Sequence, residues 1–208
     1  MNTPDDSARR PLKSRSTAWA RALSGVLIRR RVSPNDVSLA GIGFACIGAG
    51  ALLLMSRGWL SPGIALFLGA AGVQLRLLCN MMDGLVAVEG GLKSKAGDLF
   101  NEAPDRIEDV VLLVAAGYAC GHVELGWCCA VLAVATAYFR ALGASLGFGQ
   151  DFRGPCAKPH RMAILTGGLL ASLIPVQLPF LTGSLWLIAG LTAITLGRRI
   201  LLIYRKLP

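Results

Sequence analysis

A dense group of acidic residues marks the middle of this chain. Seven of its twelve acidic residues fall in one short segment: Asp83, Glu89, Asp98, Glu102, Asp105, Glu108 and Asp109. The segments on either side are strongly apolar. Carboxylates beside apolar helices are costly to keep and are seldom retained for stability alone. We therefore interpret this segment as the functional centre, in which side-chain oxygen atoms hold a ligand.

The spacing of these residues predicts a site shared by two helices. Asn80 and Asp83 are three positions apart and so lie on the same face of a helix. A second set, at spacings of 4, 3 and 4, forms one stripe: Asp98, Glu102, Asp105 and Asp109, with Asn101 beside it. Two helix ends can then present oxygen atoms to each other across a small gap. Hard cations such as Mg²⁺ favour this arrangement, because they take about six oxygen ligands, several of them from water or substrate phosphate.

Two alternatives stay open for this segment. It could be a solvated loop with ordinary helical ion pairs, such as Glu102 with Arg106. Pro104 also affects where the second helix begins, because proline is tolerated in a first turn and not deeper. If that helix begins at Asn101 instead of Gly97, Asp98 lies outside it and the stripe is shorter.

The composition indicates an integral membrane protein. Of the 208 residues, 54% are hydrophobic and 16% are charged, whereas a soluble domain carries about 25% charged residues. Several runs of about twenty residues contain at most one charge, which is enough for a helix to cross about 30 Å of hydrocarbon. The fold class is therefore predicted to be all-α and polytopic.

Six transmembrane helices are predicted, at residues 37–55, 61–82, 97 or 101–120, 125–146, 162–180 and 183–203. A turn at 33–36 precedes the first of them, with Asn35 or Asp36 as its helix cap. We assign residues 1–16 to a disordered tail and 17–208 to one membrane domain.

Residues 17–32 precede the first span and combine apolar positions with several arginines. This pattern is typical of an N-terminal amphipathic interfacial helix whose arginines contact anionic phosphates. A plain basic anchor on the cytoplasmic side explains the pattern equally well.

The basic residues predict the orientation of the protein. Six spans place both termini on one side, and nearly all Lys and Arg residues fall there, while the other side holds Arg57. By the positive-inside rule, both termini and the acidic segment face the cytoplasm, in a multi-pass protein of the inner membrane. The same rule accounts for the net charge of +9. We expect no nucleic-acid binding, because no basic stripe alternates with aromatic residues.

A long spaced motif resembles that of a known family. It consists of Asn80-x2-Asp83-Gly84-x2-Ala87-Val88, eight further residues, and then Gly97-x3-Asn101-x3-Asp105. The pattern resembles the signature of the CDP-alcohol phosphotransferases, also called CDP-alcohol phosphatidyltransferases: D-x2-D-G-x2-A-R, eight or nine residues, then G-x3-D-x3-D. All of the spacings match, and the predicted spans extend the resemblance over most of the chain.

The resemblance implies a membrane transferase of phospholipid biosynthesis. Such an enzyme moves a phosphatidyl or related phospho-alcohol group from CDP-diacylglycerol or another CDP-alcohol to an acceptor hydroxyl and releases CMP. The resemblance also implies Mg²⁺ or Mn²⁺ as cofactor, membrane lipids as surroundings, and a homodimer. By resemblance, the metal and the diphosphate bind at Asn80, Asp83, Asn101 and Asp105, and Asp105 is the catalytic base. Residues that leave room for the nucleotide beside Asp83 are Gly84, Ala87 and Gly97.

Three departures from the family pattern affect this interpretation. Asn80 and Asn101 replace aspartates, and Val88 replaces the arginine. Asparagine keeps an oxygen ligand and lacks the charge, so metal affinity should fall or one of two ions should be lost. Glu102 is the first candidate to restore the charge as a metal ligand. The alternative is a catalytically impaired member that binds CDP-lipid or a protein partner without turnover.

The loop before the fifth span offers a site for the acceptor. Lys158, His160 and Arg161 lie at a helix start on the same side as the acidic segment, where they can hold a phosphate. Arg106 and Arg153 are further candidates. The predicted acceptor is therefore a polyol or a polyol phosphate. A basic cytoplasmic loop without a binding role explains these residues equally well.

Overall fold

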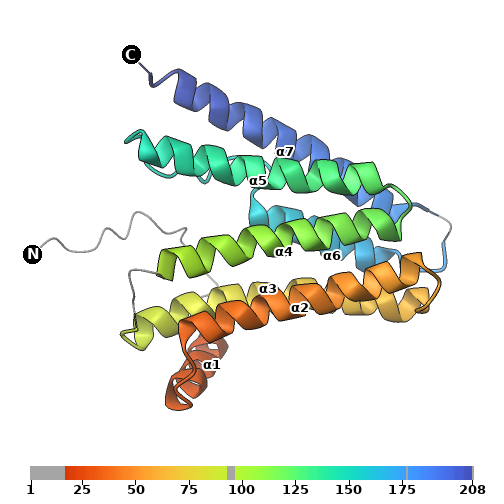
Figure 1. Ribbon diagram of the computed structural model, residues 1–208, viewed down its shortest axis with the longest axis horizontal. Helices are drawn as coiled ribbons and strands as arrows, with labels where there is room; N and C mark the ends of the chain where they lie inside the picture. The colour runs from red at the N-terminus through yellow and green to blue at the C-terminus, as the bar shows by residue number, and fades with distance from the viewer. Residues whose placement is uncertain (1–16, 93–96, 177, 208) are drawn as a thin grey trace, which may run out of the picture.

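The computed structural model describes residues 17–92, 97–176 and 178–207, and the regular structure in these ranges is helical (Figure 1). They contain seven helices: α1 (Ala18–Arg29), α2 (Pro34–Ser56), α3 (Pro62–Glu89), α4 (Gly97–Ala119), α5 (Val123–Ser145), α6 (Lys158–Ala171) and α7 (Phe180–Tyr204). The predicted all-α class is confirmed. The tail predicted at residues 1–16 lies outside the described residues.

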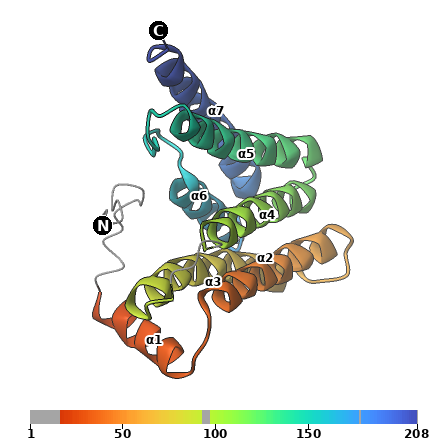
Figure 2. The same ribbon diagram turned by 60° about the vertical axis from the view of Figure 1, so that its left-hand side comes forward.

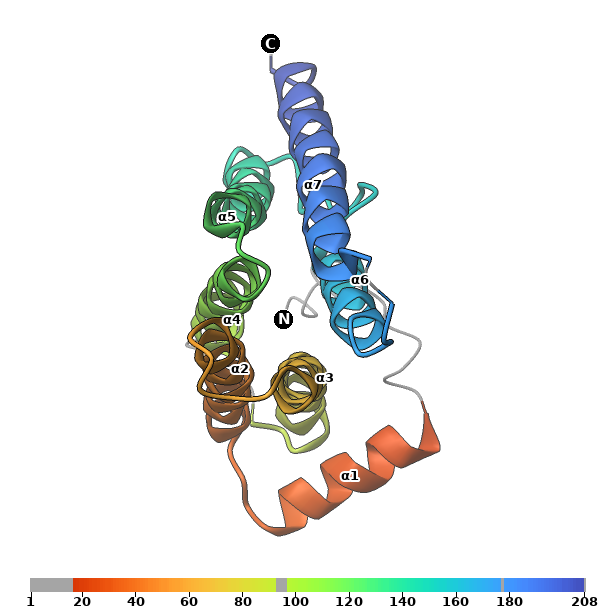
Figure 3. The same cartoon turned by 90° about the vertical axis from the view of Figure 1, so that its right-hand side faces the viewer.

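Helices α2 to α7 extend along the long axis of the molecule, and α1 crosses one end of α3 (Figures 1 and 3). Figure 2 shows α1 projecting from the lower end of this assembly. Ser24 of α1 donates a hydrogen bond to Glu89, the last residue of α3. The buried face of α1 packs Ala20 against a cluster that includes Cys79 and Met82. Helix α1 therefore covers the end of α3 that carries the acidic segment.

In the part of the chain that the structure describes, four helices are long and apolar enough to cross a membrane: α2, α3, α5 and α7. Helix α4 has sufficient length but carries a group of charged residues in its first half. Helix α6 has only 14 residues. Four of the six predicted spans therefore have the length and composition of a transmembrane helix by themselves.

Several predicted boundaries need correction. The fifth span was predicted to reach residue 180, whereas α6 ends at Ala171. Pro175 and Pro179 follow, and proline cannot donate the backbone hydrogen bond that a helix interior needs. The second span was predicted to end near Met82, whereas α3 continues to Glu89, so Asp83 lies inside a helix.

The start of α2 also differs from the prediction. Ser33, not Asn35 or Asp36, is the N-cap. The Ser33 hydroxyl accepts a hydrogen bond from the Asp36 amide at 3.1 Å, and the Asp36 carboxylate accepts one from the Ser33 amide at 3.2 Å. This capping box satisfies two backbone donors at once, and Pro34 fits the first turn, where no donor is needed.

Close helix contact at glycine holds α2 against α3. A Cβ atom placed on Gly72 would lie 2.8 Å from the Gly48 Cα and 2.8 Å from the Phe44 carbonyl oxygen. Such contacts let two backbones approach within van der Waals distance, which is the main attraction available between helices in lipid. The same arrangement joins α4 to α5 at Gly117 and Gly126.

Gly72→Ala should destabilise the protein, because the added methyl group would force α2 and α3 apart. We expect a loss of about 1–3 kcal/mol, typical of overpacking, measured as thermal unfolding in detergent. Gly43→Ala is the matched control, since no atom lies within 4 Å of its added Cβ and alanine favours a helix over glycine. Equal melting temperatures for Gly72→Ala and the unmodified protein would contradict the packing argument.

Candidate functional site

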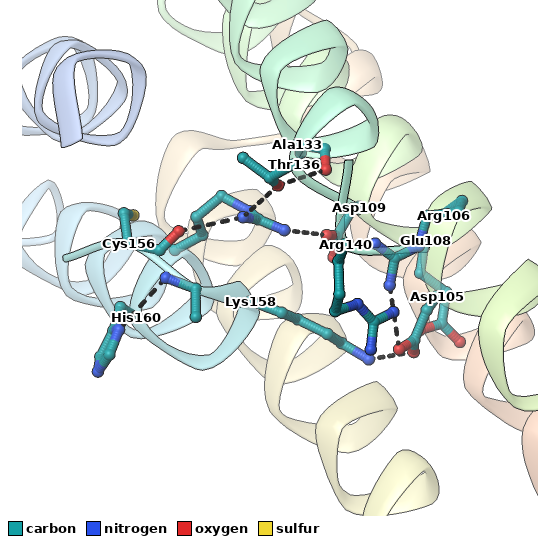
Figure 4. Close-up of polar contacts among 12 residues, drawn as sticks. Asp105, Arg106, Glu108, Asp109, Ala133, Thr136, Arg140, Cys156, Lys158 and His160 are labelled. Atoms are coloured by element: carbon teal, nitrogen blue, oxygen red, sulfur yellow. Dashed lines mark hydrogen bonds and ion pairs between the residues drawn. The ribbon is translucent and has the colours of Figure 1, made fainter. Parts of the chain in front are cut away.

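The acidic segment forms a polar cluster between α3, α4 and the start of α6 (Figure 4). Asn80 of α3 donates a hydrogen bond from Nδ2 to Oδ1 of Asp105 on α4, at 2.6 Å. The spacing had predicted that these two helices would present polar side chains to each other. The Asn80–Asp105 contact is an instance of that arrangement.

Asp83 lies one turn beyond Asn80 and is buried. The Ser38 hydroxyl of α2 donates to its Oδ2 at 2.7 Å, and the backbone amide of Gly84 donates to its Oδ1 at 2.5 Å. Ser38 was not identified from the sequence. Its position five residues after the N-cap of α2 is the only signal, because that places it near the same membrane face as the acidic segment.

Asp105 is surrounded by cationic groups from three helices. Lys158, the first residue of α6, reaches across to Oδ1 of Asp105 (Figure 4). Arg106 lies 3.4 Å from Oδ2, and Arg76 of α3 lies 3.8 Å from Oδ1. Its carboxylate is therefore fixed between an amide, an ammonium and two guanidinium groups.

A second set of ion pairs lies deeper in the protein. Arg76 donates to Glu108 at 3.0 Å and to Asp109 at 2.6 Å. Arg161 of α6 donates to the other oxygen of Asp109 at 2.8 Å and also contacts the Cys156 carbonyl at 3.3 Å. The Arg76 and Asp109 side chains are 0% and 1% exposed. These contacts join α3, α4 and α6 beneath Asp105.

Arg76 was also missed in the sequence. The available signal was a single charge inside an apolar span, four residues before Asn80 and seven before Asp83. That spacing places all three on one face of α3. An isolated charge at such a position is itself a functional indicator in a membrane helix.

Glu102 contacts a residue that the sequence analysis did not consider. Its carboxylate accepts a hydrogen bond from Arg140 of α5 at 2.5 Å and lies 3.7 Å from Arg106. The pair with Arg106 is the one expected for an ordinary helical ion pair. Arg106 thus links Glu102 to Asp105.

Two carboxylates of the cluster have the donor chemistry that a divalent cation takes. The described residues contain no group of three His, Cys, Asp or Glu side chains placed to hold a metal. The Asp83 and Asp105 carboxylates come from facing helices, and Mg²⁺ is commonly held by one or two carboxylates with water and substrate phosphate. The donor set therefore fits an ion shared with a phosphate ligand. The side chains of Asp98 and Asn101 and the surroundings of Gly97 lie outside the described part of the structure.

The remaining residues predicted for an acceptor occupy different settings. Arg161 is buried in its pair with Asp109. The His160 Nδ1 accepts a hydrogen bond from the Ala157 amide at 3.4 Å, at the start of α6. Lys158 and Arg106 both contact Asp105. These two cations lie nearest the carboxylate that was predicted to be catalytic.

Arg153 forms an outer ion pair with Asp151 in the loop before α6. Its side chain is 75% exposed and its Nε donates to Asp151 at 3.0 Å. Burial acts to raise the pKa of Asp151, but the hydrogen bonds from Arg153 outweigh it and hold this pKa below its usual value. Among the described residues, Arg153 is paired with Asp151, which lies outside the acidic cluster.

Asp109→Asn should strongly destabilise the protein, because it leaves Arg76 and Arg161 without their shared carboxylate. Breaking a buried ion pair from one side costs about 3–5 kcal/mol, which thermal unfolding in detergent will measure. Asp151→Asn, at an exposed pair, is the control and should cost less than about 1 kcal/mol. If both variants unfold at the same temperature, the buried ion pairs stabilise the fold no more than the exposed pair does.

Two relatives that share one name match this chain over most of its length. The chain is 31% identical over 205 residues to a phosphatidylinositol phosphate synthase of Mycobacterium marinum, covering 91% of this chain and 82% of the relative. It is 29% identical over 195 residues to a phosphatidylinositol phosphate synthase of Streptomyces avermitilis, covering 86% and 75%. No family model matches the chain.

Solved structures agree with these relatives. Mycobacterium tuberculosis phosphatidylinositol phosphate synthase with CDP-DAG bound has a TM-score of 0.76 and 25% identity, covering 90% of this chain and 94% of that one. The same enzyme in complex with manganese and citrate has a TM-score of 0.75 and 25% identity, covering 89% and 88%.

Proposed function

Because the chain belongs to the CDP-alcohol phosphatidyltransferase family, we propose that it transfers a phosphatidyl group from CDP-diacylglycerol to inositol phosphate. The family predicted from the spaced motif is confirmed, and with it a membrane transferase of phospholipid biosynthesis. The donor and the acceptor are taken from the relatives, one of which has CDP-DAG bound. The observation that carries the proposal is the Asp105 carboxylate held beside Asn80 and Lys158.

The proposed reaction is a single phosphoryl-group transfer. The acceptor hydroxyl oxygen bonds to the lipid-linked phosphorus, the bond from that phosphorus to the CMP oxygen breaks, and CMP leaves with the electron pair. Asp105 accepts the hydroxyl proton, as a general base within hydrogen-bond reach can do. Asp83, Asn80, Asn101 and Asp105 would hold Mg²⁺ or Mn²⁺, which supplies positive charge to the diphosphate when bound.

Lys158 can couple binding of the acceptor to release of the base, Asp105. Its ammonium group is paired with Oδ1 of Asp105. An incoming acceptor phosphate offers Lys158 a second anion and releases Asp105. Arg106, His160, Arg153 and Arg161 complete the proposed acceptor region, and Glu102 remains a candidate metal ligand. Gly84, Ala87 and Gly97 leave space for the nucleotide.

One observation favours a second candidate function. Asn80 contacts Asp105 through its amide nitrogen, so in this arrangement it acts as a donor to the carboxylate. With Val88 in place of the family arginine, this favours a member that binds CDP-lipid without turnover. The two candidates differ in CMP release and agree in CDP-lipid binding.

The purified protein should release CMP from CDP-diacylglycerol when inositol phosphate and Mg²⁺ or Mn²⁺ are supplied. Asp105→Asn should lower kcat by about 10²–10⁴-fold, the usual contribution of a general base, and chelation of the metal should stop the reaction reversibly. Glu124→Gln, at the exposed start of α5, is the control and should keep full activity.

Each other outcome has a distinct meaning. Binding of CDP-lipid without CMP release supports the second candidate. CMP release with a different polyol only would show that the acceptor is wrong while the transferase remains. A wild-type protein that neither binds CDP-lipid nor releases CMP would contradict both candidate functions.

We also propose six membrane crossings, with α4 and α6 included, and α1 in the interfacial region. Both termini and the acidic segment then face the cytoplasm of the inner membrane. The distribution of Lys and Arg residues between the two sides of the spans supports this orientation.

This orientation can be tested with single cysteines in a cysteine-free background. A membrane-impermeant maleimide should label Arg57→Cys on cells whose inner membrane is intact. Lys206→Cys should be labelled only after that membrane is opened. The opposite labelling pattern would place the polar cluster on the outer side.

A further inference from the structure

We propose that Arg76 is a positioning residue for Asp105, acting through Glu108 and Asp109 to fix how α4 is rotated against α3. The inference rests on the proposed function, because its consequence is a rate of phosphatidyl transfer. Nothing in the spaced motif includes Arg76 or Glu108, so this pair lies outside the residues that the resemblance assigns.

The three carboxylates that meet Arg76 lie on one face of α4. Asp105, Glu108 and Asp109 are spaced i, i+3 and i+4, which places them side by side on a helix. Glu108 and Asp109 are bound by separate nitrogens of the guanidinium, at 3.0 and 2.6 Å, and Asp105 lies 3.8 Å away. A rotation of α4 by one residue would break both hydrogen bonds and turn Asp105 away from Asn80.

Helix α2 confines this arrangement from the other side. A Cβ atom on Gly41 would lie 2.7 Å from Oε1 of Glu108 and 3.3 Å from the Cys79 Cβ. The Glu108 side chain therefore contacts the backbone of α2 at Gly41 and accepts its hydrogen bond from Arg76 beside that contact. The glycine leaves room for one carboxylate at this point of three-helix contact.

The arrangement is a poor choice for stability alone. Buried ion pairs can often be replaced by apolar residues at no loss of stability. Among the described residues, the buried Nε of Arg76 has no hydrogen-bond partner, and a buried donor left without a partner is destabilising. A guanidinium that binds two carboxylates at once does fix geometry, which a lysine cannot reproduce.

The first test compares Arg76→Lys and Glu108→Gln with the wild-type enzyme in CMP release. We expect kcat to fall roughly tenfold to a hundredfold, the effect of a small displacement of a reacting group, while KM for CDP-diacylglycerol changes little. Gln74→Leu is the matched control. Gln74 lies on α3 two residues before Arg76 and outside the cluster. Its substitution removes a hydrogen bond to Thr166 of α6 and should leave kcat unchanged.

The second test separates positioning from folding. In Arg76→Met with Glu108→Met, the Glu108 pair is replaced by apolar side chains, and Asp109 keeps Arg161. We expect this double variant to recover the wild-type melting temperature while its kcat stays low. Recovery of kcat together with the melting temperature would show a purely structural pair and overturn the inference. If the double variant fails to fold, Arg76→Lys and Glu108→Gln decide, since unchanged kcat in both would also overturn it.

Failure of this inference is distinct from failure of the proposed function. An active wild-type enzyme with fully active Arg76 and Glu108 variants rejects only the positioning role. A wild-type protein without CMP release rejects the transferase itself.

Discussion

The mutual neutralisation of buried charges is the constraint on which this structure depends. In the described chain, three carboxylates of the cluster (Asp105, Glu108, Asp109) are paired with cations of the same region (Arg76, Arg106, Lys158, Arg161). An isolated charge removed from water is very unfavourable, so each group holds its helix near a partner. Helices α3, α4 and α6 are thereby joined at one end by ion pairs. Glycine contacts and apolar side chains supply the rest of the packing.

Much of this fold could be predicted from the sequence because membrane spans have a strong signal. The lengths of apolar runs located α2, α3, α5 and α7, and the spacing of the polar residues indicated that α3 and α4 present polar side chains to each other. The end of α6 was harder to predict, since residues 162–180 are apolar and only Pro175 and Pro179 interrupt them. Hydropathy indicates which residues can lie in lipid. It says little about where the backbone hydrogen bonds of a helix end.

The partners of each side chain could not be predicted in the same way. Spacing placed Glu102, Asp105 and Asp109 in one stripe, yet Glu102 contacts Arg140 of α5 while the other two contact α3 and α6. A stripe two turns long meets more than one neighbouring helix, and only the packing angles decide which. Arg76 was overlooked for the same reason, since its role depends on carboxylates that lie over thirty positions later.

The shared carboxylate of Asp109 has a consequence for how such a protein can diverge. Two arginines from different helices bind its two oxygens, so loss of Asp109 removes the carboxylate partner of Arg161 and one of the two carboxylates that bind Arg76. Replacement of Asp109 by a neutral residue therefore leaves the buried Arg161 without a carboxylate, and a second change at Arg161 is needed to remove that cost. Positions such as Asn80 and Val88, which carry no buried counter-charge, can vary one at a time. Asp109 is thus a position where a change in one helix requires a matching change in another.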